Sequence, residues 1–149
     1  MEPLAELLAS IRAGDGERVR ELVHELPDAA AARDELGLSA VLIAARLGHD
    51  AIVQVLLDAN PPLDVHDAAA VGRTRALAEL LDADAGAVSR RTPDDEATPL
   101  HLAAERGRSG TVELLLEHGA DRGSTDREGR TPAQLARAAG HDDLAELLS

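Results

Sequence analysis

The feature that most constrains the fold is a glycine that returns at nearly regular intervals along the chain. The steps between Gly14, Gly48, Gly72, Gly107 and Gly140 are 34, 24, 35 and 33 residues, so three of the four are nearly equal. An apolar triplet with helical spacing follows each glycine. The triplets are Val19/Leu22/Val23, Val53/Leu56/Leu57, Leu77/Leu80/Leu81, Val112/Leu115/Leu116 and Leu144/Leu147/Leu148. The pattern predicts a series of helical hairpins, each burying one face of its second helix.

The best-defined copy of the repeat begins at residues 98–104, which read Thr-Pro-Leu-His-Leu-Ala-Ala. A threonine oxygen at a helix start accepts from a free backbone N–H, and proline suits the first helical position because it has no N–H to lose. Thr131 and Pro132 repeat the arrangement, and Ser39 can cap the second copy. With a period near the ~33 residues of ankyrin arrays, the chain resembles the ankyrin repeat family over nearly its whole length.

The resemblance implies an all-α ankyrin-repeat solenoid of about five helix–turn–helix units with short β-turn or hairpin fingers. We expect a single domain over residues 1–149, with repeats at about 1–33, 34–62, 63–92, 93–125 and 126–149. The third repeat lacks its finger, because Asn60-Pro61-Pro62 breaks one helix and the next begins at once. An internal duplication and a neutral deletion explain this gap equally well.

Composition agrees with a thin core. The 149 residues are 44% hydrophobic and include no Phe, Trp, Tyr or Cys. Small aliphatic side chains suffice when each repeat packs only on its neighbours, and the lack of cysteine fits a reducing cytosol. No apolar run reaches the ~18 residues of a membrane span, and Met1-Glu2-Pro3 lacks the basic start of a secretory signal. We therefore expect a cytoplasmic protein.

Charge narrows the class of partner. Asp and Glu total 28 against 15 basic residues, which gives a net charge of −13, and every basic residue is arginine. An acidic protein repels phosphate backbones and attracts basic partners. The sequence thus disfavours nucleic acid and predicts another protein as the partner, with a basic surface as one option. The lack of lysine and the abundance of alanine and arginine indicate a bacterial source with a GC-rich genome.

No catalytic, cofactor or metal motif is convincing. Gly14-Asp15-Gly16 lacks the preceding strand and third glycine of a dinucleotide loop. The run from Asp82 to Gly86 resembles a calcium loop, but Pro93 stands where the ligand Glu belongs. The six histidines lack zinc-ligand spacing. The resemblance implies structural hydrogen bonds for the ring of His101. We expect no cofactor, no metal and no enzymatic activity.

The resemblance also implies where a partner binds: the finger tips and the exposed face of the first helices, which form a concave surface. By register, the finger residues are Glu35, Leu36, Leu38, Asp94, Asp95, Ala97, Arg127, Glu128 and Arg130. The ends of the inner helices supply Arg12, Arg46, Leu47, Val71, Glu105 and Arg106. Arg46 and Arg106 are the first candidates, because arginine is enriched at interface hot spots. The three leucines are expected at exposed positions, where they would form an apolar contact patch.

The predicted function is therefore non-enzymatic protein–protein interaction, as an adaptor or scaffold. The alternative is an acidic inhibitor, of the immunity or antitoxin type, that blocks a basic partner protein. Salt-sensitive association would favour the inhibitor, and a salt-insensitive complex centred on the three leucines would favour the adaptor. Arg137 replaces an alanine of the stacking pairs and would block a sixth repeat, so we expect a monomer.

Overall fold

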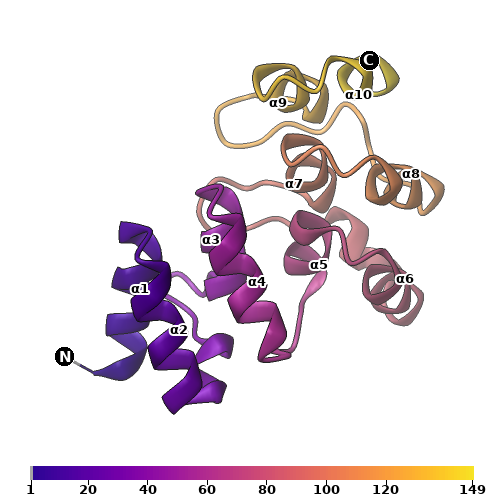
Figure 1. The fold of residues 1–149 in the computed structure, drawn as a ribbon. Helices are drawn as coiled ribbons and strands as arrows, with labels where there is room; N and C mark the ends of the chain where they lie inside the picture. The colour runs from indigo at the N-terminus through magenta and orange to yellow at the C-terminus, as the bar shows by residue number, and fades with distance from the viewer. Residues whose placement is uncertain (1) are drawn as a thin grey trace. The chain divides into compact units, whose positions relative to one another are not determined.

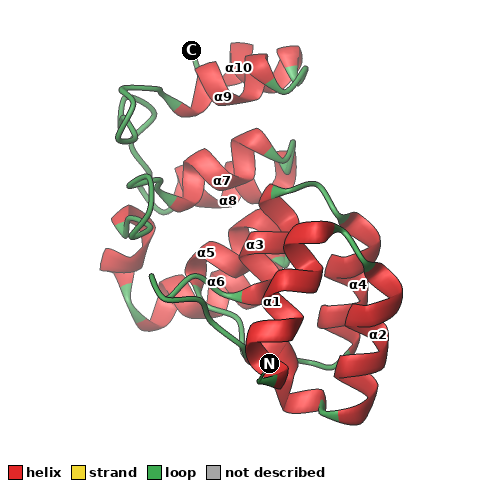
Figure 2. Ribbon diagram, turned by 90° about the vertical axis from the view of Figure 1, so that its left-hand side faces the viewer, coloured by secondary structure: helices red, strands yellow, loops and turns green. Residues whose placement is uncertain are grey.

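The computed structural model describes residues 2–149 (Figures 1 and 2). In this range the chain forms ten α-helices and two short 3-10 helices, without a strand. The prediction of an all-α ankyrin-type fold is confirmed. The chain divides into two compact units, residues 1–62 and residues 63–149.

The first unit contains two stacked helical hairpins. Its elements are α1 (Pro3–Ala13), α2 (Gly16–Glu25), η1 (Pro27–Ala31), α3 (Ala40–Arg46) and α4 (Asp50–Asp58). Helix α1 packs against α3, and α2 packs against α4, so the hairpins lie in register. Their fully buried large side chains include Leu7, Ile11, Val19 and Leu56.

The second unit contains three hairpins. Its elements are α5 (Val65–Val71), α6 (Thr74–Ala83), η2 (Ala85–Ser89), α7 (Pro99–Glu105), α8 (Ser109–Glu117), α9 (Pro132–Ala138) and α10 (Asp142–Leu147). Helices α5, α7 and α9 form an inner row, while α6 and α8 lie in an outer row (Figure 1). The core between the rows consists of small aliphatic side chains, among them Ala69, Leu77, Ala103, Leu115 and Ala136.

Side-chain caps begin α3, α5, α7 and α9, and those of α3, α7 and α9 are the ones that the sequence predicts. The Thr98 hydroxyl accepts from the His101 N–H, and the Ser39 hydroxyl accepts from the Leu42 N–H at 2.9 Å. Thr131 caps α9 in the same way and forms a capping box with Gln134. Asp64 caps α5, so the third inner helix begins with a carboxylate in place of a hydroxyl. These local bonds satisfy backbone donors that the helix itself leaves free.

The repeating glycines close the first helix of each hairpin. All five have left-handed backbones, with φ between 69° and 88°. A side chain is disfavoured in that conformation, which explains why glycine returns at this place in every repeat.

The segments that join the hairpins differ in length. Residues 26–39, 84–98 and 118–131 join successive hairpins, whereas the join between α4 and α5 is only residues 59–64. The longer joins carry fingers, which we define as the second (34–38), fourth (92–97) and fifth (126–130). Extended pairing among residues 2–149 is limited to one bridge, between Arg33 and Ser39. The two compact units separate between Pro62 and Leu63, within the short join.

Candidate interaction surface

A single carboxylate holds the second finger in shape. One oxygen of Asp34 accepts from the Leu36 N–H at 3.0 Å and from the Leu38 N–H at 2.9 Å. The backbone adds a bond from Gly37 N–H to the Asp34 carbonyl at 3.0 Å. Aspartate favours such turns because its short side chain reaches the backbone two residues on. These bonds fix the backbone of the tip residues between Asp34 and Gly37, whose side chains remain exposed.

The fifth finger uses the same device. One oxygen of Asp126 accepts from the Glu128 N–H at 3.0 Å and from the Arg130 N–H at 2.9 Å, while the other accepts from the Arg130 guanidinium at 3.0 Å. Burial by itself raises the pKa of Asp126, but the bonds and charge from Arg130 outweigh it and lower that pKa below its usual value. The carboxylate therefore stays ionised and keeps the finger closed at neutral pH.

The fourth finger is one residue longer and has a different closure. The Thr92 hydroxyl donates to Asp95 at 2.8 Å and accepts from the Ala97 N–H at 3.1 Å. Glu96 takes the left-handed conformation, with φ 59°, that glycine takes at the matching place in the other two fingers. A turn of this kind strains a residue with a side chain.

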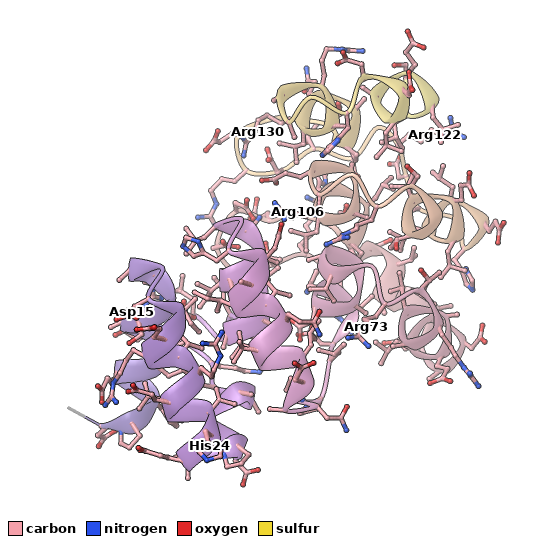
Figure 3. The ribbon with its side chains drawn as sticks, viewed as in Figure 1. Asp15, His24, Arg73, Arg106, Arg122 and Arg130 are labelled. Atoms are coloured by element: carbon pink, nitrogen blue, oxygen red, sulfur yellow. The ribbon has the colours of Figure 1, made fainter. Side chains whose placement is uncertain are left out.

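Neighbouring fingers of the second unit are bonded to each other. The Arg127 N–H donates to the Asp95 carbonyl at 2.7 Å, and the Arg91 guanidinium donates to the Thr125 carbonyl at 2.6 Å. Beneath them, the ring Nε2 of His101 bonds the Arg130 carbonyl at 2.8 Å. Arg130 stands just before α9, as Figure 3 shows. The fourth and fifth fingers therefore behave as one bonded pair.

The second finger instead faces a pocket of about 560 Å³ against α1. Its walls are Leu4, Ala5, Leu8, Arg12, Arg33, Asp34, Glu35 and Leu36. Leu4 and Leu36 are 46% and 58% exposed, which makes them two of the five exposed large apolar side chains of residues 2–149. Sequence reasoning selected Arg12, Glu35 and Leu36 but missed Leu4 and Leu8. An apolar residue at the start of a helix that has no finger before it was the available signal.

The family model described as "Ankyrin repeats (3 copies)" matches residues 65–149, more than half of the chain. The chain belongs to the ankyrin repeat family. The matched region is nearly the whole of the second unit, whose three hairpins are three ankyrin repeats.

The curated relatives of this chain match it only in part. The ARF GTPase-activating protein GIT1 of Homo sapiens is 54% identical over 56 residues, which is 38% of this chain and 7% of that protein. Git of Drosophila melanogaster is 47% identical over 55 residues, 37% of this chain and 8% of that protein. The ankyrin repeat and SOCS box protein 11 of Danio rerio is 39% identical over 101 residues, 62% of this chain and 33% of that protein. The chain thus spans a third or less of each of these relatives.

Most of the residues predicted to bind a partner have solvent access on the ankyrin repeats. The exposed ones are Arg12, Glu35, Leu36, Leu47, Arg127 and Glu128, and the half-buried ones are Arg46, Val71, Asp94, Asp95, Glu105, Arg106 and Arg130. Arg46 and Arg106 already interact with other groups of the protein. Arg106 directly follows α7 (Figure 3). Solvent access does not test whether these residues bind a partner, so that role stays a prediction.

Leu38 is a correction to the predicted apolar patch. It is only 9% exposed, whereas Leu36 and Leu47 are 58% and 49% exposed. Leu38 immediately precedes the cap residue Ser39, and a side chain at that position packs back onto the first turn of the helix. Ala97, at the same register in the fourth repeat, is likewise a predicted finger residue that the structure buries, at 1% exposed. The apolar contact surface therefore loses one of its three expected leucines.

Residues 2–149 offer neither a metal site nor a membrane-spanning helix. Residues 2–149 contain no cluster of three or more His, Asp or Glu side chains placed to hold a metal ion. None of the helices in that range combines the length and apolar character needed to cross a bilayer. The surface described above is built from fingers and helix ends, and its chemistry is that of hydrogen bonds, charge and exposed apolar side chains.

Proposed function

We propose that this chain is a non-enzymatic protein-binding module, an adaptor or scaffold that holds a partner with its finger tips and inner-helix face. The observation that carries the proposal is the build of the second and fifth fingers. An aspartate bonds two backbone N–H groups in each finger, and yet Glu35, Leu36, Arg127 and Glu128 remain exposed. A loop whose backbone is already ordered loses little backbone entropy when it binds, which favours affinity.

The net charge of −13 supports a second candidate, an acidic inhibitor that blocks a basic protein. Charge of one sign accelerates association with an oppositely charged partner, and salt weakens the effect. Under either candidate we propose that the protein is a cytoplasmic monomer. We also propose a bacterial source, because the composition is lysine-free and rich in arginine.

A tip variant with a matched control tests the proposal. The tip variant carries Glu35→Ala, Leu36→Ala, Arg127→Ala and Glu128→Ala. The control carries Glu17→Ala, Leu26→Ala, Arg20→Ala and Glu113→Ala, which removes the same residue types and the same net charge from exposed positions outside the fingers. Both variants and the unaltered protein serve as bait for partners in a cell extract, and the binding of each captured protein is then measured after purification.

We expect a partner that binds the unaltered protein and the control equally and binds the tip variant at least about tenfold more weakly, a loss of about 1.4 kcal/mol. Equal binding by the tip variant would contradict the proposed surface. Repeating the measurement from about 0.1 M to about 1 M salt shortens the Debye length from about 10 Å to about 3 Å. A large loss of affinity over that range favours the inhibitor, and an unchanged affinity favours the adaptor.

A further inference from the structure

The second and fifth fingers have equivalent residues in different surroundings. In both, an aspartate is followed by two tip residues and a glycine, so Glu35 corresponds to Arg127. Both turns are closed by a 3.0 Å bond from the glycine N–H to the aspartate carbonyl. In the fifth finger, the N–H of Arg127 donates to a carbonyl of the preceding finger, that of Asp95. The space next to the Arg127 N–H is thus filled by the preceding finger.

Within residues 2–149 the second finger has no such neighbour, since the element that shares its pocket is the helix α1 (Pro3–Ala13). The N–H of Glu35 accordingly has no acceptor among residues 2–149. Glu35 is an exposed turn residue, and a backbone N–H without a partner there can donate to a carbonyl of a bound peptide. Glu35 is also one of the residues that line the pocket between the second finger and α1.

The pocket beside this donor suits an apolar side chain. Leu8 is 8% exposed, while Leu4 and Leu36 are 46% and 58% exposed. Apolar surface in a concavity next to a hydrogen-bond donor is the usual composition of a specific binding site. In an extended peptide, successive side chains point to opposite faces. A peptide whose backbone carbonyl accepts from the Glu35 N–H would therefore place one of its side chains on the apolar floor of the pocket, formed by Leu4, Leu8 and Leu36.

The charges of the pocket distinguish between ligands. The guanidinium of Arg12 lies 3.1 Å from the Asp34 carboxylate, and that of Arg33 donates to the Gly37 carbonyl at 2.8 Å. Both cations are therefore engaged within the protein. The carboxylate of Glu35 has no partner among residues 2–149, and the protein as a whole carries −13. A basic side chain on the ligand has the complementary charge.

We propose that the pocket between α1 and the second finger binds an extended segment of a partner protein that carries a large apolar side chain next to an arginine or lysine. The segment takes the place that the fourth finger has beside the fifth: its backbone carbonyl accepts from the Glu35 N–H, its apolar side chain packs on Leu4, Leu8 and Leu36, and its basic side chain pairs with the Glu35 carboxylate. This inference rests on the proposed protein-binding function and names the kind of ligand for one part of that surface.

The test uses the full chain and a phage-displayed library of random short peptides as the probe. The most enriched peptide is synthesised, its binding is measured by fluorescence anisotropy, and amide exchange is followed by NMR. Glu35→Pro deletes the proposed donor group together with the side-chain charge, and proline is favoured at this second position of a turn. Glu35→Ala separates the two effects, because it removes the charge and keeps the N–H. Leu36→Asp puts a charge on the apolar floor, and Leu26→Asp is its control at a leucine that is 44% exposed outside the pocket.

We expect enriched peptides that share a large apolar residue beside arginine or lysine, and slower exchange of the Glu35 amide when the peptide binds. Glu35→Pro should bind about fivefold more weakly than Glu35→Ala, as expected for one net hydrogen bond. Leu36→Asp should weaken binding by more than about tenfold, with Leu26→Asp unchanged. Since Leu36 is exposed, circular dichroism should report the same helix content in every variant.

Three results would overturn the inference: no enrichment above a bare-surface selection, exchange protection elsewhere but not at Glu35, or equal affinity of the proline and alanine variants. Each of them leaves the proposed function standing if capture of a native partner still depends on the finger tips. The proposed function fails separately, when the tip variant captures that partner as well as the control does.

Discussion

At the scale of single residues, His101 joins two structural features with one ring. It is fully buried, and its Nδ1 accepts from the Thr98 N–H at 3.2 Å. Because Nδ1 accepts, the proton of the neutral ring lies on Nε2, which donates to the Arg130 carbonyl. The same side chain thus closes the cap of α7 and fastens the fifth finger. The structural role implied by the ankyrin resemblance is confirmed, and the structure adds the acceptor.

This burial predicts a loss of stability in mild acid. Burial lowers the pKa of His101 below its usual value, against the opposing effect of the bond to Arg130. In the unfolded chain the ring has an ordinary pKa of about 6.5. Below that pH the unfolded state binds a proton that the native state resists, so the free energy of unfolding falls as the pH falls below about 6.5. Urea unfolding of the protein at a series of pH values measures the effect.

The variant His101→Gln isolates this contribution. Glutamine already forms the capping box at the matching position of the last repeat, where Gln134 accepts from the Thr131 N–H at 2.8 Å. We expect a loss of about 1–3 kcal/mol at neutral pH, because the Arg130 carbonyl loses its donor. The gap between the two proteins should narrow in acid. A gap that stays constant with pH would contradict the lowered pKa of the buried ring.

A pair of glycines separates backbone strain from side-chain contact. Gly107 and Gly140 both have left-handed backbones, with φ 69° and 88°. A Cβ at Gly107 would lie 2.7 Å from the His141 ring, whereas a Cβ at Gly140 would meet no atom within 4 Å. Gly140→Ala should cost about 1 kcal/mol for the backbone alone, and Gly107→Ala should cost more. This additional destabilisation of Gly107→Ala should disappear when His141→Ala is added to both variants. Thermal unfolding of the two single and two double variants measures it. A difference that persists would place the strain in the backbone.

At the scale of elements, the fingers show how one motif acquires two roles. The second and fifth fingers share the aspartate bonds and the glycine turn, so their local sequences dictate the same shape. They differ in what lies beside them: the fifth finger bonds the fourth through Arg127, and the second borders a pocket. A finger is thus a stabilising contact in one place and an open edge in the other.

Proline substitutions at the two equivalent tips measure this difference. Arg127→Pro removes the donor of the 2.7 Å bond to Asp95, whereas Glu35→Pro removes an N–H that has no acceptor among residues 2–149. Relative to the alanine variants, Glu35→Pro should be neutral or stabilising by up to about 1 kcal/mol, since proline restricts the unfolded chain. Arg127→Pro should be about 1 kcal/mol less favourable than that. Equal effects in chemical unfolding would show that the bond between the fingers contributes no stability.

At the scale of the whole molecule, the division after Pro62 coincides with the join that lacks a finger. The second unit has its own core, drawn entirely from residues 65–148, and three repeats. The first unit has two hairpins. Ankyrin-type arrays need about three repeats for stability, because a single repeat cannot bury its apolar face.

We therefore expect the fragment 63–149 to fold alone, with helical circular dichroism and a cooperative thermal transition, and the fragment 1–62 to lack such a transition. Leu115→Asp, at a side chain that is 0% exposed, is the control that should unfold the longer fragment. A non-cooperative 63–149 would contradict the assignment of an independent core. The predicted single domain over 1–149 is tested in the same scan, where one transition of the full chain supports it and two transitions oppose it.

The sequence by itself determined the features that depend on near neighbours. The caps at Ser39, Thr98 and Thr131 and the left-handed glycines follow from bonds and steric limits within a few residues, and the helical hairpins follow from apolar spacing. Net charge also needs no structure, because it is a sum over residues.

The tertiary structure alone decided which side chains the solvent reaches and which distant groups meet. Leu38 is buried although its register suggests exposure, Leu4 and Leu8 line a pocket with Leu36, and Arg127 reaches Asp95. The pocket and the bond between Arg127 and Asp95 depend on the placement of segments that lie far apart in the chain, and a local pattern of residues carries no information about such placement. The burial of Leu38 has a nearer cause, the first turn of the helix that follows it.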